Sequence, residues 1–188
     1  MAEKNFLRIY INANSSKKFD IITRHYVDFI GIVDGYTEGL RYQIECDKDS
    51  CKREALGDLG VRVQTGGCSD PTQSKALNRI LTKEAIVNCD FSKNELSGLD
   101  RADEYIQIAF CLRDMRKDYE LFKNQMGVLG GESEIFERYL SGSLTLRGFA
   151  EEKGITYESA QQRMHKIRCK LRRQVIGCME GKFLNLSC

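Results

Sequence analysis

Apolar residues recur at alternating spacings of three and four along most of this chain, and this pattern constrains its fold more than any other feature. Such spacing places the apolar side chains on one face of an α-helix. Only one of the 188 residues is proline, Pro71, so the residue that breaks helices most strongly is nearly absent. The pattern predicts an all-α fold, in which a bundle of long helices over residues 1–126 precedes a C-terminal helix-turn-helix domain.

The first apolar stripe begins near Ser16 and predicts a helix on which glycine recurs at Gly31, Gly35 and Gly39. Its members are Phe19, Ile22, Tyr26, Phe29, Val33, Tyr36 and Leu40. Glycine lowers helix propensity by roughly 1 kcal/mol relative to alanine. We therefore expect packing to hold a weak helix, or the helix to bend or break near the glycines, or another helix to approach closely there. Residues 5–11, rich in β-branched and aromatic types, predict a short strand or a docked arm.

A glycine-rich loop over residues 57–70 separates this stripe from a second helix. Asp70 and Pro71 suit a helix start, because aspartate accepts hydrogen bonds from free backbone amides and proline fits the first helical position. We expect a helix from Pro71 to about Asn88. Its apolar face would consist of Ala76 or Leu77, Ile80, Leu81, Ile86 and Val87.

The clearest stripe runs from Tyr105 to Met126. Its members are Tyr105, Ile108, Leu112, Met115, Tyr119, Phe122 and Met126. Such a seam packs inside a helical bundle, here against the 19–40 stripe, or forms part of a homodimer interface, and the sequence leaves both alternatives open. Three glycines within residues 127–131 then indicate a linker between the N-terminal region and the C-terminal domain.

Residues 132–178 predict three helices, followed by a tail over residues 179–188. The first helix covers residues 132–140, the second residues 146–153, and the third runs from Tyr157 to about Val175.

The residues at the ends of the second and third helices support this assignment. Thr145 and Thr156 suit the N-terminal caps, and Gly154 suits the left-handed residue of the turn. The inward-facing residues are Leu146, Phe149, Ala150, Ile155, Ala160, Met164, Ile167 and Leu171. This spacing is typical of a helix-turn-helix, whose second helix enters the major groove of DNA.

The charge of the third helix sets it apart from the rest of the chain. Between Tyr157 and Arg173 it carries six basic residues and one acidic residue, a net charge of +5 in a chain whose total is +2. The predicted phosphate contacts are Thr145, Lys166, Arg168, Lys170, Arg172 and Arg173. The predicted base contacts, at the start of the helix, are Tyr157, Ser159, Gln161, Gln162 and Arg163. A basic helix packed on an acidic partner protein is the alternative.

The run from Leu144 to Thr156, followed by Ala160 to Arg172, resembles region 4 of sigma-70-type factors. The chain before it has no counterpart of the region that melts promoters. A wider resemblance is to the RinA/ArpU-type late transcription regulators of phages, through residues 63–66, 70–72 and 138–142 together with the helix-turn-helix. Phe149 stands where that pattern usually has isoleucine. The resemblance implies a phage or prophage transcription regulator that activates transcription and contacts RNA polymerase.

Two other functions use the same motif. A small terminase-like packaging adaptor marks DNA with a helix-turn-helix, and a divergent sigma factor would direct initiation itself. A footprint upstream of a promoter favours the regulator, a footprint at a packaging site with ring-shaped oligomers favours the adaptor, and initiation with core polymerase alone favours the sigma factor.

Several function classes are disfavoured. The sequence contains no phosphate-binding loop, no zinc-protease motif and no nucleophile motif, so we expect neither enzymatic activity nor a cofactor. The eight cysteines form no Cys-x-x-Cys pair, which favours buried or incidental thiols over a metal or redox sensor. The N-terminus has no long apolar region, so we expect a protein of the bacterial host cytoplasm, associated with the nucleoid and not with a membrane.

Overall fold

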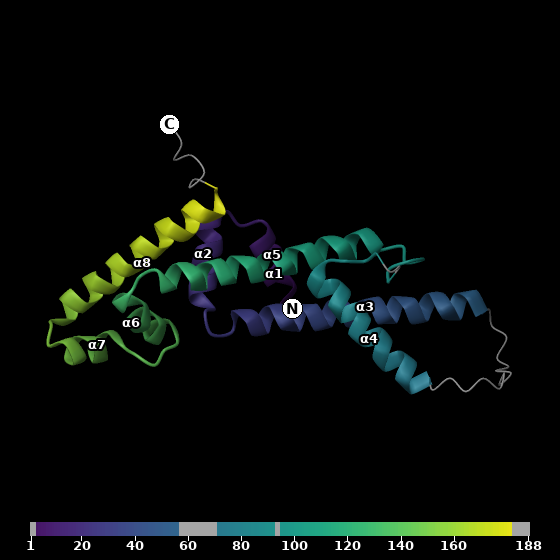
Figure 1. Cartoon of the computed structure of the whole chain (residues 1–188), viewed down its shortest axis with the longest axis horizontal. Coiled ribbons are helices and arrows are strands. Elements are labelled where there is room, and N and C mark those ends of the chain that lie inside the picture. The colour runs from purple at the N-terminus through teal and green to yellow at the C-terminus, as the bar shows by residue number, and fades with distance from the viewer. Residues whose placement is uncertain (1–2, 57–70, 93–94, 182–188) are drawn as a thin grey trace. The chain divides into compact units, whose positions relative to one another are not determined.

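The computed structural model describes residues 3–56, 71–92 and 95–181, and within these ranges the chain is helical and contains no strand. The predicted all-α fold is confirmed. In chain order the helices are α1 (Glu3–Ile11), α2 (Ser15–Arg24), α3 (Phe29–Leu56), α4 (Pro71–Asn88), α5 (Ala102–Gly127), α6 (Gly131–Leu140), α7 (Leu146–Lys153) and α8 (Tyr157–Met179) (Figure 1). Among the residues described, no helix combines the length and apolar character needed to cross a membrane.

The chain divides into two compact units, and the division differs from the predicted one. Residues 1–30 and 116–188 form unit 1, and residues 31–115 form unit 2. The predicted linker, residues 127–131, lies inside unit 1, where Gly127 ends α5, Gly131 begins α6 and only residues 128–130 form a turn. Leu129 in this turn is only 5% exposed, so its side chain is packed in the interior of the unit. The segment is therefore part of unit 1 and does not link two separate units. The predicted loop at 57–70 lies outside the described residues.

Residues 5–11 form a helix, so the predicted short strand is wrong, whereas the alternative of an arm docked on the rest of the chain agrees with the structure. Tyr10 on α1 is 1% exposed. Its ring centroid lies 5.7 Å from that of Phe29, and its hydroxyl donates to Asp118 Oδ2 at 2.9 Å. Burial of aromatic side chains on one face, at a spacing compatible with a helix, outweighs the strand preference of these residue types.

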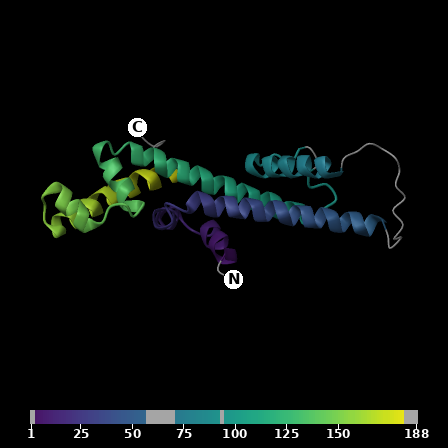
Figure 2. The same cartoon turned by 90° about the horizontal axis from the view of Figure 1, so that it is seen from below.

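The first stripe is buried as predicted except for Tyr36, which is half-buried, but it extends over two helices and the turn between them. Residues 25–28 form a turn between α2 and α3, where the Asp28 amide donates to the His25 carbonyl at 3.0 Å (Figure 2). This turn contains neither glycine nor proline. Phe19 on α2 packs on Phe122 of α5, with 5.5 Å between ring centroids. The three glycines, by contrast, leave α3 unbroken.

The apolar stripe on α5 packs against other helices of the same chain. Phe29 stacks on Tyr119 with ring centroids 5.5 Å apart. Tyr105, Leu112, Met115, Phe122 and Met126 are each no more than 2% exposed. Because these side chains are already buried, the bundle alternative accounts for them and a homodimer seam along this stripe does not.

A polar cluster joins three segments of unit 1. The Tyr26 hydroxyl donates to Glu137 Oε1 at 2.7 Å, and Lys123 Nζ donates to both, at 2.9 Å and 2.8 Å respectively. Burial raises the pKa of Tyr26 to about 12, against an opposing hydrogen bond from Lys123. The hydrogen bonds from Lys123 and Tyr26 lower the pKa of Glu137. Because Glu137 lies in the C-terminal half of α6, the cluster fixes that part of α6, and with it the helix-turn-helix, against α5.

In unit 2, α4 has the predicted bounds but buries only part of the predicted face, since Ile86 is buried and Leu81 half-buried. Thr82, Ala85 and Ile86 are buried, whereas Leu77 and Ile80 are each 55% exposed. Ion pairs from α4 to α3 accompany this packing, including Lys83 Nζ to Glu38 Oε1 at 2.5 Å. Apolar residues fill both sides of α4, so their spacing alone did not identify the inner side.

Replacing Gly35 with alanine is expected to raise the free energy of unfolding by about 0.5–1 kcal/mol. A Cβ at Gly35 would meet nothing within 4 Å, so the glycine provides no close approach and only weakens the helix. The matched variant Gly154→Ala is expected to lower the free energy of unfolding by about 1–2 kcal/mol, because alanine disfavours the left-handed backbone there, where φ is +61°. Urea denaturation followed by circular dichroism measures both changes. Destabilisation by Gly35→Ala would show that another surface covers this face of α3.

Candidate nucleic-acid interface

The three C-terminal helices of unit 1 form the predicted helix-turn-helix, with α6 and α7 both packed on α8. The side chains that the apolar spacing predicted to face inward are buried or half-buried. Phe149 and Ala150 on α7, and Ala160, Met164, Ile167 and Leu171 on α8, are at most 7% exposed. Leu146 and Ile155 are half-buried. The buried stripe of α8 continues to Val175, so one apolar face holds the whole helix in place.

Local hydrogen bonds set the ends of α7 and α8. The Thr145 hydroxyl accepts from the Gly148 amide at 3.0 Å, and the Thr156 hydroxyl accepts from the Ser159 amide at 3.2 Å. Gly154 ends α7 with φ 61° and ψ 35°, which lets the Ile155 amide donate to the Ala150 carbonyl at 3.0 Å. The predicted caps and the left-handed turn residue are confirmed.

An ion pair also connects α6 to α7. Arg138 donates to both carboxylate oxygens of Glu152, at 2.7 Å and 3.2 Å. The hydrogen bond lowers the pKa of Glu152 and raises that of Arg138. Because the pair is bidentate, it restrains the angle between the two helices more than a single contact would.

Most predicted base contacts lie on the free surface of the first turns of α8. Tyr157 is 49% exposed, and Ser159, Gln161 and Gln162 are exposed. Arg163 differs, because its guanidinium lies 5.9 Å from the ring centroid of Phe149 and 4.0 Å from Glu132 of α6. It therefore points toward the other helices of the motif, which makes it a weaker candidate for base contact than the glutamines.

The predicted phosphate contacts fall into two groups. Lys166, Lys170 and Arg173 are exposed, and none of them has an acidic partner among the described residues. Arg168 and Arg172 instead share Asp20 of α2, at 2.9 Å and 3.3 Å, and Arg172 also contacts the Ser16 hydroxyl. Thr145 is exposed, and its hydroxyl keeps a free donor although its oxygen caps α7.

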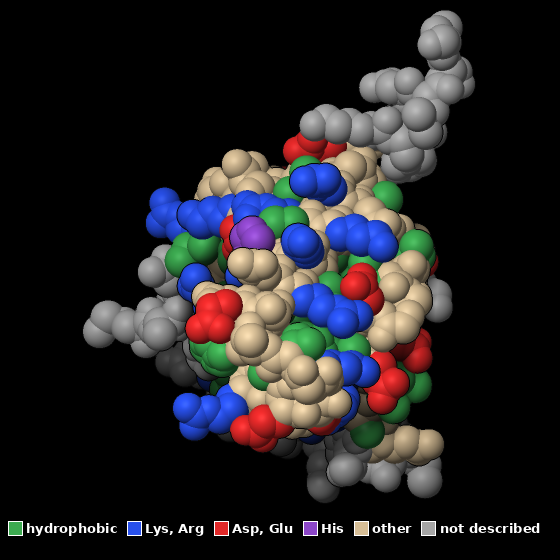
Figure 3. Space-filling model, turned by 90° about the vertical axis from the view of Figure 1, so that its left-hand side faces the viewer, with side chains coloured by type: hydrophobic (Ala, Val, Ile, Leu, Met, Phe, Trp, Pro, Cys, Tyr) green, Lys and Arg blue, Asp and Glu red, His purple; other side chains and the backbone are tan. Residues whose placement is uncertain are grey.

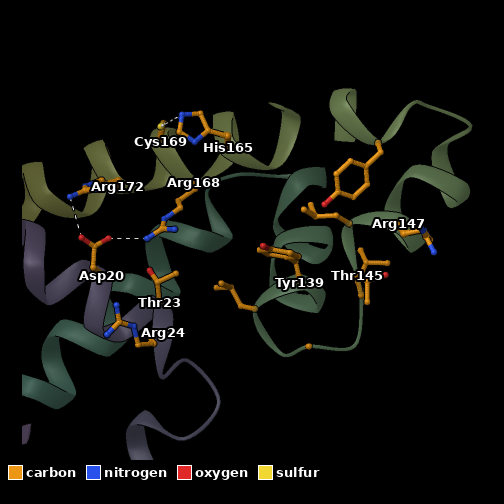
Figure 4. Close-up of a pocket in the computed structure, with 15 residues that line it drawn as sticks. Asp20, Thr23, Arg24, Tyr139, Thr145, Arg147, His165, Arg168, Cys169 and Arg172 are labelled. Carbon is orange, nitrogen blue, oxygen red and sulfur yellow. Dashed lines mark hydrogen bonds and ion pairs between the residues drawn. The ribbon is translucent and has the colours of Figure 1, made fainter. Parts of the chain in front are cut away.

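A groove beside α8 brings α2 next to the helix-turn-helix within unit 1 (Figure 4). Its volume is about 1390 Å³. Asp20, Thr23 and Arg24 lie along α2, and Tyr139, Thr145 and Arg147 lie across from them (Figure 4). On α8 the Cys169 sulfur lies 3.4 Å from His165 Nε2.

Sequence reasoning missed the contributions of Arg24, Arg147 and His165 to this surface. A helical projection of α8 would have found His165, which lies four residues after Gln161 and so on the same face. Arg147 lies two residues after the Thr145 cap. The sequence predicted its place in the helix over residues 146–153 but did not predict that it contacts DNA. Nothing in the sequence indicates that α2 lies beside α8.

The surface around this end of the motif is rich in Lys and Arg, which cluster over the upper half of the face shown in Figure 3. Comparison of the chain with protein-family models, with curated proteins and with solved structures finds no match. The candidate interface therefore rests on its own geometry and charge.

Proposed function

We propose that this chain is a sequence-specific regulator of transcription that binds duplex DNA through α7 and α8. The observation that carries the proposal is α8 itself. Its inner face is buried along its length. Its outer face presents two amide side chains in its first turns, followed by basic side chains that have no acidic partner among the residues described. Amides contact adenine edges in the major groove, whereas basic groups neutralise phosphates.

The position of α7 supports the same docking. In a helix-turn-helix complex the first helix of the motif crosses the DNA backbone while the second lies in the major groove. The N-terminal end of α7 presents the hydroxyl of its cap, Thr145, and the exposed guanidinium of Arg147 in its first turn. Both are groups that contact phosphate oxygens.

The resemblance to region 4 of sigma factors supports a role in transcription and a contact with RNA polymerase. Transcription from a promoter adjoining the selected binding site, with host RNA polymerase holoenzyme present, is expected to rise when the chain is added. Binding confined to a packaging site, with no effect on transcription, would contradict the regulatory role and favour the packaging adaptor.

Replacing Gln162 with alanine is expected to weaken binding to a selected site about 5- to 150-fold, because one bidentate base contact is worth about 1–3 kcal/mol. Binding to random duplex should change little. Lys166→Ala should instead weaken both by a similar factor and reduce the salt slope by about 0.9, since it removes one phosphate contact. Sites selected from a random duplex pool with the full chain, followed by fluorescence anisotropy, provide the measurement.

Gln107→Ala is the matched control, because Gln107 is an exposed glutamine on α5 in unit 2. It should leave both affinities unchanged. If the random pool yields no enriched sequence, or if Gln162→Ala binds the selected site as tightly as the wild-type chain, α8 does not discriminate between bases and the proposed function fails.

A further inference from the structure

The groove between α2 and the helix-turn-helix is strongly basic. Four arginines line it, from three helices: Arg24 on α2, Arg147 on α7, and Arg168 and Arg172 on α8. Its acidic lining consists of Asp20 alone among the described residues. A groove with this excess of guanidinium groups attracts an anionic ligand.

The four arginines differ in whether they are already paired. Arg168 and Arg172 share the Asp20 carboxylate. Arg24, in the last turn of α2, and Arg147, in the first turn of α7, are exposed and have no acidic partner within the described ranges. These two guanidinium groups are therefore available to a ligand without first losing an ion pair.

The groove is continuous with the surface predicted to contact bases. Tyr157, Gln161, His165, Arg168 and Arg172 follow one another on α8 at spacings of four, four, three and four, so they occupy one face. Tyr157, His165, Arg168 and Arg172 line the groove. Gln161 and His165 line a smaller cavity of about 260 Å³ together with Thr23 of α2. One ligand can therefore lie along the start of α8 and against α2 together.

We propose that this groove binds the sugar-phosphate backbone of duplex DNA, so that α2 contacts DNA together with α7 and α8. This inference rests on the proposed function, and it adds Arg24 and His165 to the DNA interface already proposed for α7 and α8. Figure 4 shows Arg147 on the opposite side of the groove from Arg24, Arg168 and Arg172, so the four guanidinium groups do not all converge on one point. That arrangement suits a chain of regularly spaced phosphates better than a single small anion.

Arg24→Ala tests the inference, because Arg24 belongs to α2 and lies outside the helix-turn-helix. The probe is a mixed-sequence duplex of about 30 base pairs, roughly three helical turns. Near 0.1 M salt the variant is expected to bind about 5- to 10-fold more weakly than the wild-type chain, and its salt slope should fall by about 0.9. Arg8→Ala, at an exposed arginine of α1 that does not line the groove, should bind as wild type.

The outcomes separate the two proposals. If Arg24→Ala binds duplex as tightly as the wild-type chain while Lys166→Ala is weakened, α2 does not contact DNA and the groove inference is overturned, although the proposed function stands. If the wild-type chain binds no duplex but binds poly-glutamate, and Arg24→Ala loses that binding, the groove accepts an acidic protein and both proposals are overturned. Unchanged circular dichroism in Arg24→Ala excludes a folding defect.

Discussion

Phe149→Ala is expected to lower the free energy of unfolding of unit 1 by about 3–5 kcal/mol, the usual cost of removing a buried phenylalanine ring. Phe149 is 0% exposed and lies on α7, a helix of 8 residues with a cap at each end. So short a helix depends on its buried face, because isolated helices of this length are unstable. Since a domain has only about 5–15 kcal/mol of stability in total, α7 should detach and DNA binding should be lost.

Urea denaturation followed by circular dichroism measures the stability, and fluorescence anisotropy with duplex DNA measures the binding. Phe110→Ala provides the matched control, because Phe110 is 39% exposed on α5. The free energy of unfolding of the Phe110→Ala variant is expected to differ from that of the wild-type chain by less than about 1 kcal/mol, since little buried apolar area is lost. Equal urea midpoints for Phe149→Ala and Phe110→Ala would show that α7 does not depend on its buried ring.

The helix-turn-helix could be predicted because its determinants are local. Thr145, Gly154 and Thr156 act within three or four residues of their own positions, and the apolar spacing of α8 has one consistent inner face. Cap residues and helical periodicity are the signals that a sequence shows most directly. The bounds of α6, α7 and α8 accordingly lie close to the predicted ones.

The turn between α2 and α3 could not be predicted from local signals. The stripe from Phe19 to Phe29 keeps its helical spacing through residues 25–28, and no glycine or proline marks the turn. What decides the turn is the burial of Phe19 and Phe29 against α5, which depends on residues about 90 to 100 positions away. Tertiary packing of this kind overrides the local preference.

The sequence likewise does not show which basic side chains of α8 form ion pairs. Five of its six basic residues were predicted to contact phosphates, with no distinction among them, and the sixth, Arg163, to contact a base. Asp20, 148 positions before Arg168 in the chain, removes that uniformity by pairing with two of them. Arg163, in contrast, was open to correction from spacing alone. It lies three residues after Ala160 and four before Ile167, so it borders the predicted inner face of the helix.

Asp20→Asn is expected to tighten binding to random duplex DNA about 5- to 10-fold near 0.1 M salt and to steepen the salt slope by up to about 0.9. In the wild-type chain, Arg168 and Arg172 share one carboxylate, so phosphates compete with Asp20 for the same donors. Asparagine removes that charge and leaves the side-chain size nearly unchanged. Stability should fall by no more than about 1 kcal/mol, because ion pairs with this degree of exposure contribute little.

Asp28→Asn is the matched control. It removes the same charge as Asp20→Asn, and Asp28 is exposed in the turn between α2 and α3. It does not line the groove. If the effect of Asp20 depends on its place between the two guanidinium groups, Asp28→Asn should change affinity much less. Weaker binding by Asp20→Asn would contradict this expectation. It would mean that Asp20 mainly orients Arg168 and Arg172 toward the phosphates, so that their geometry outweighs the charge that Asp20 removes.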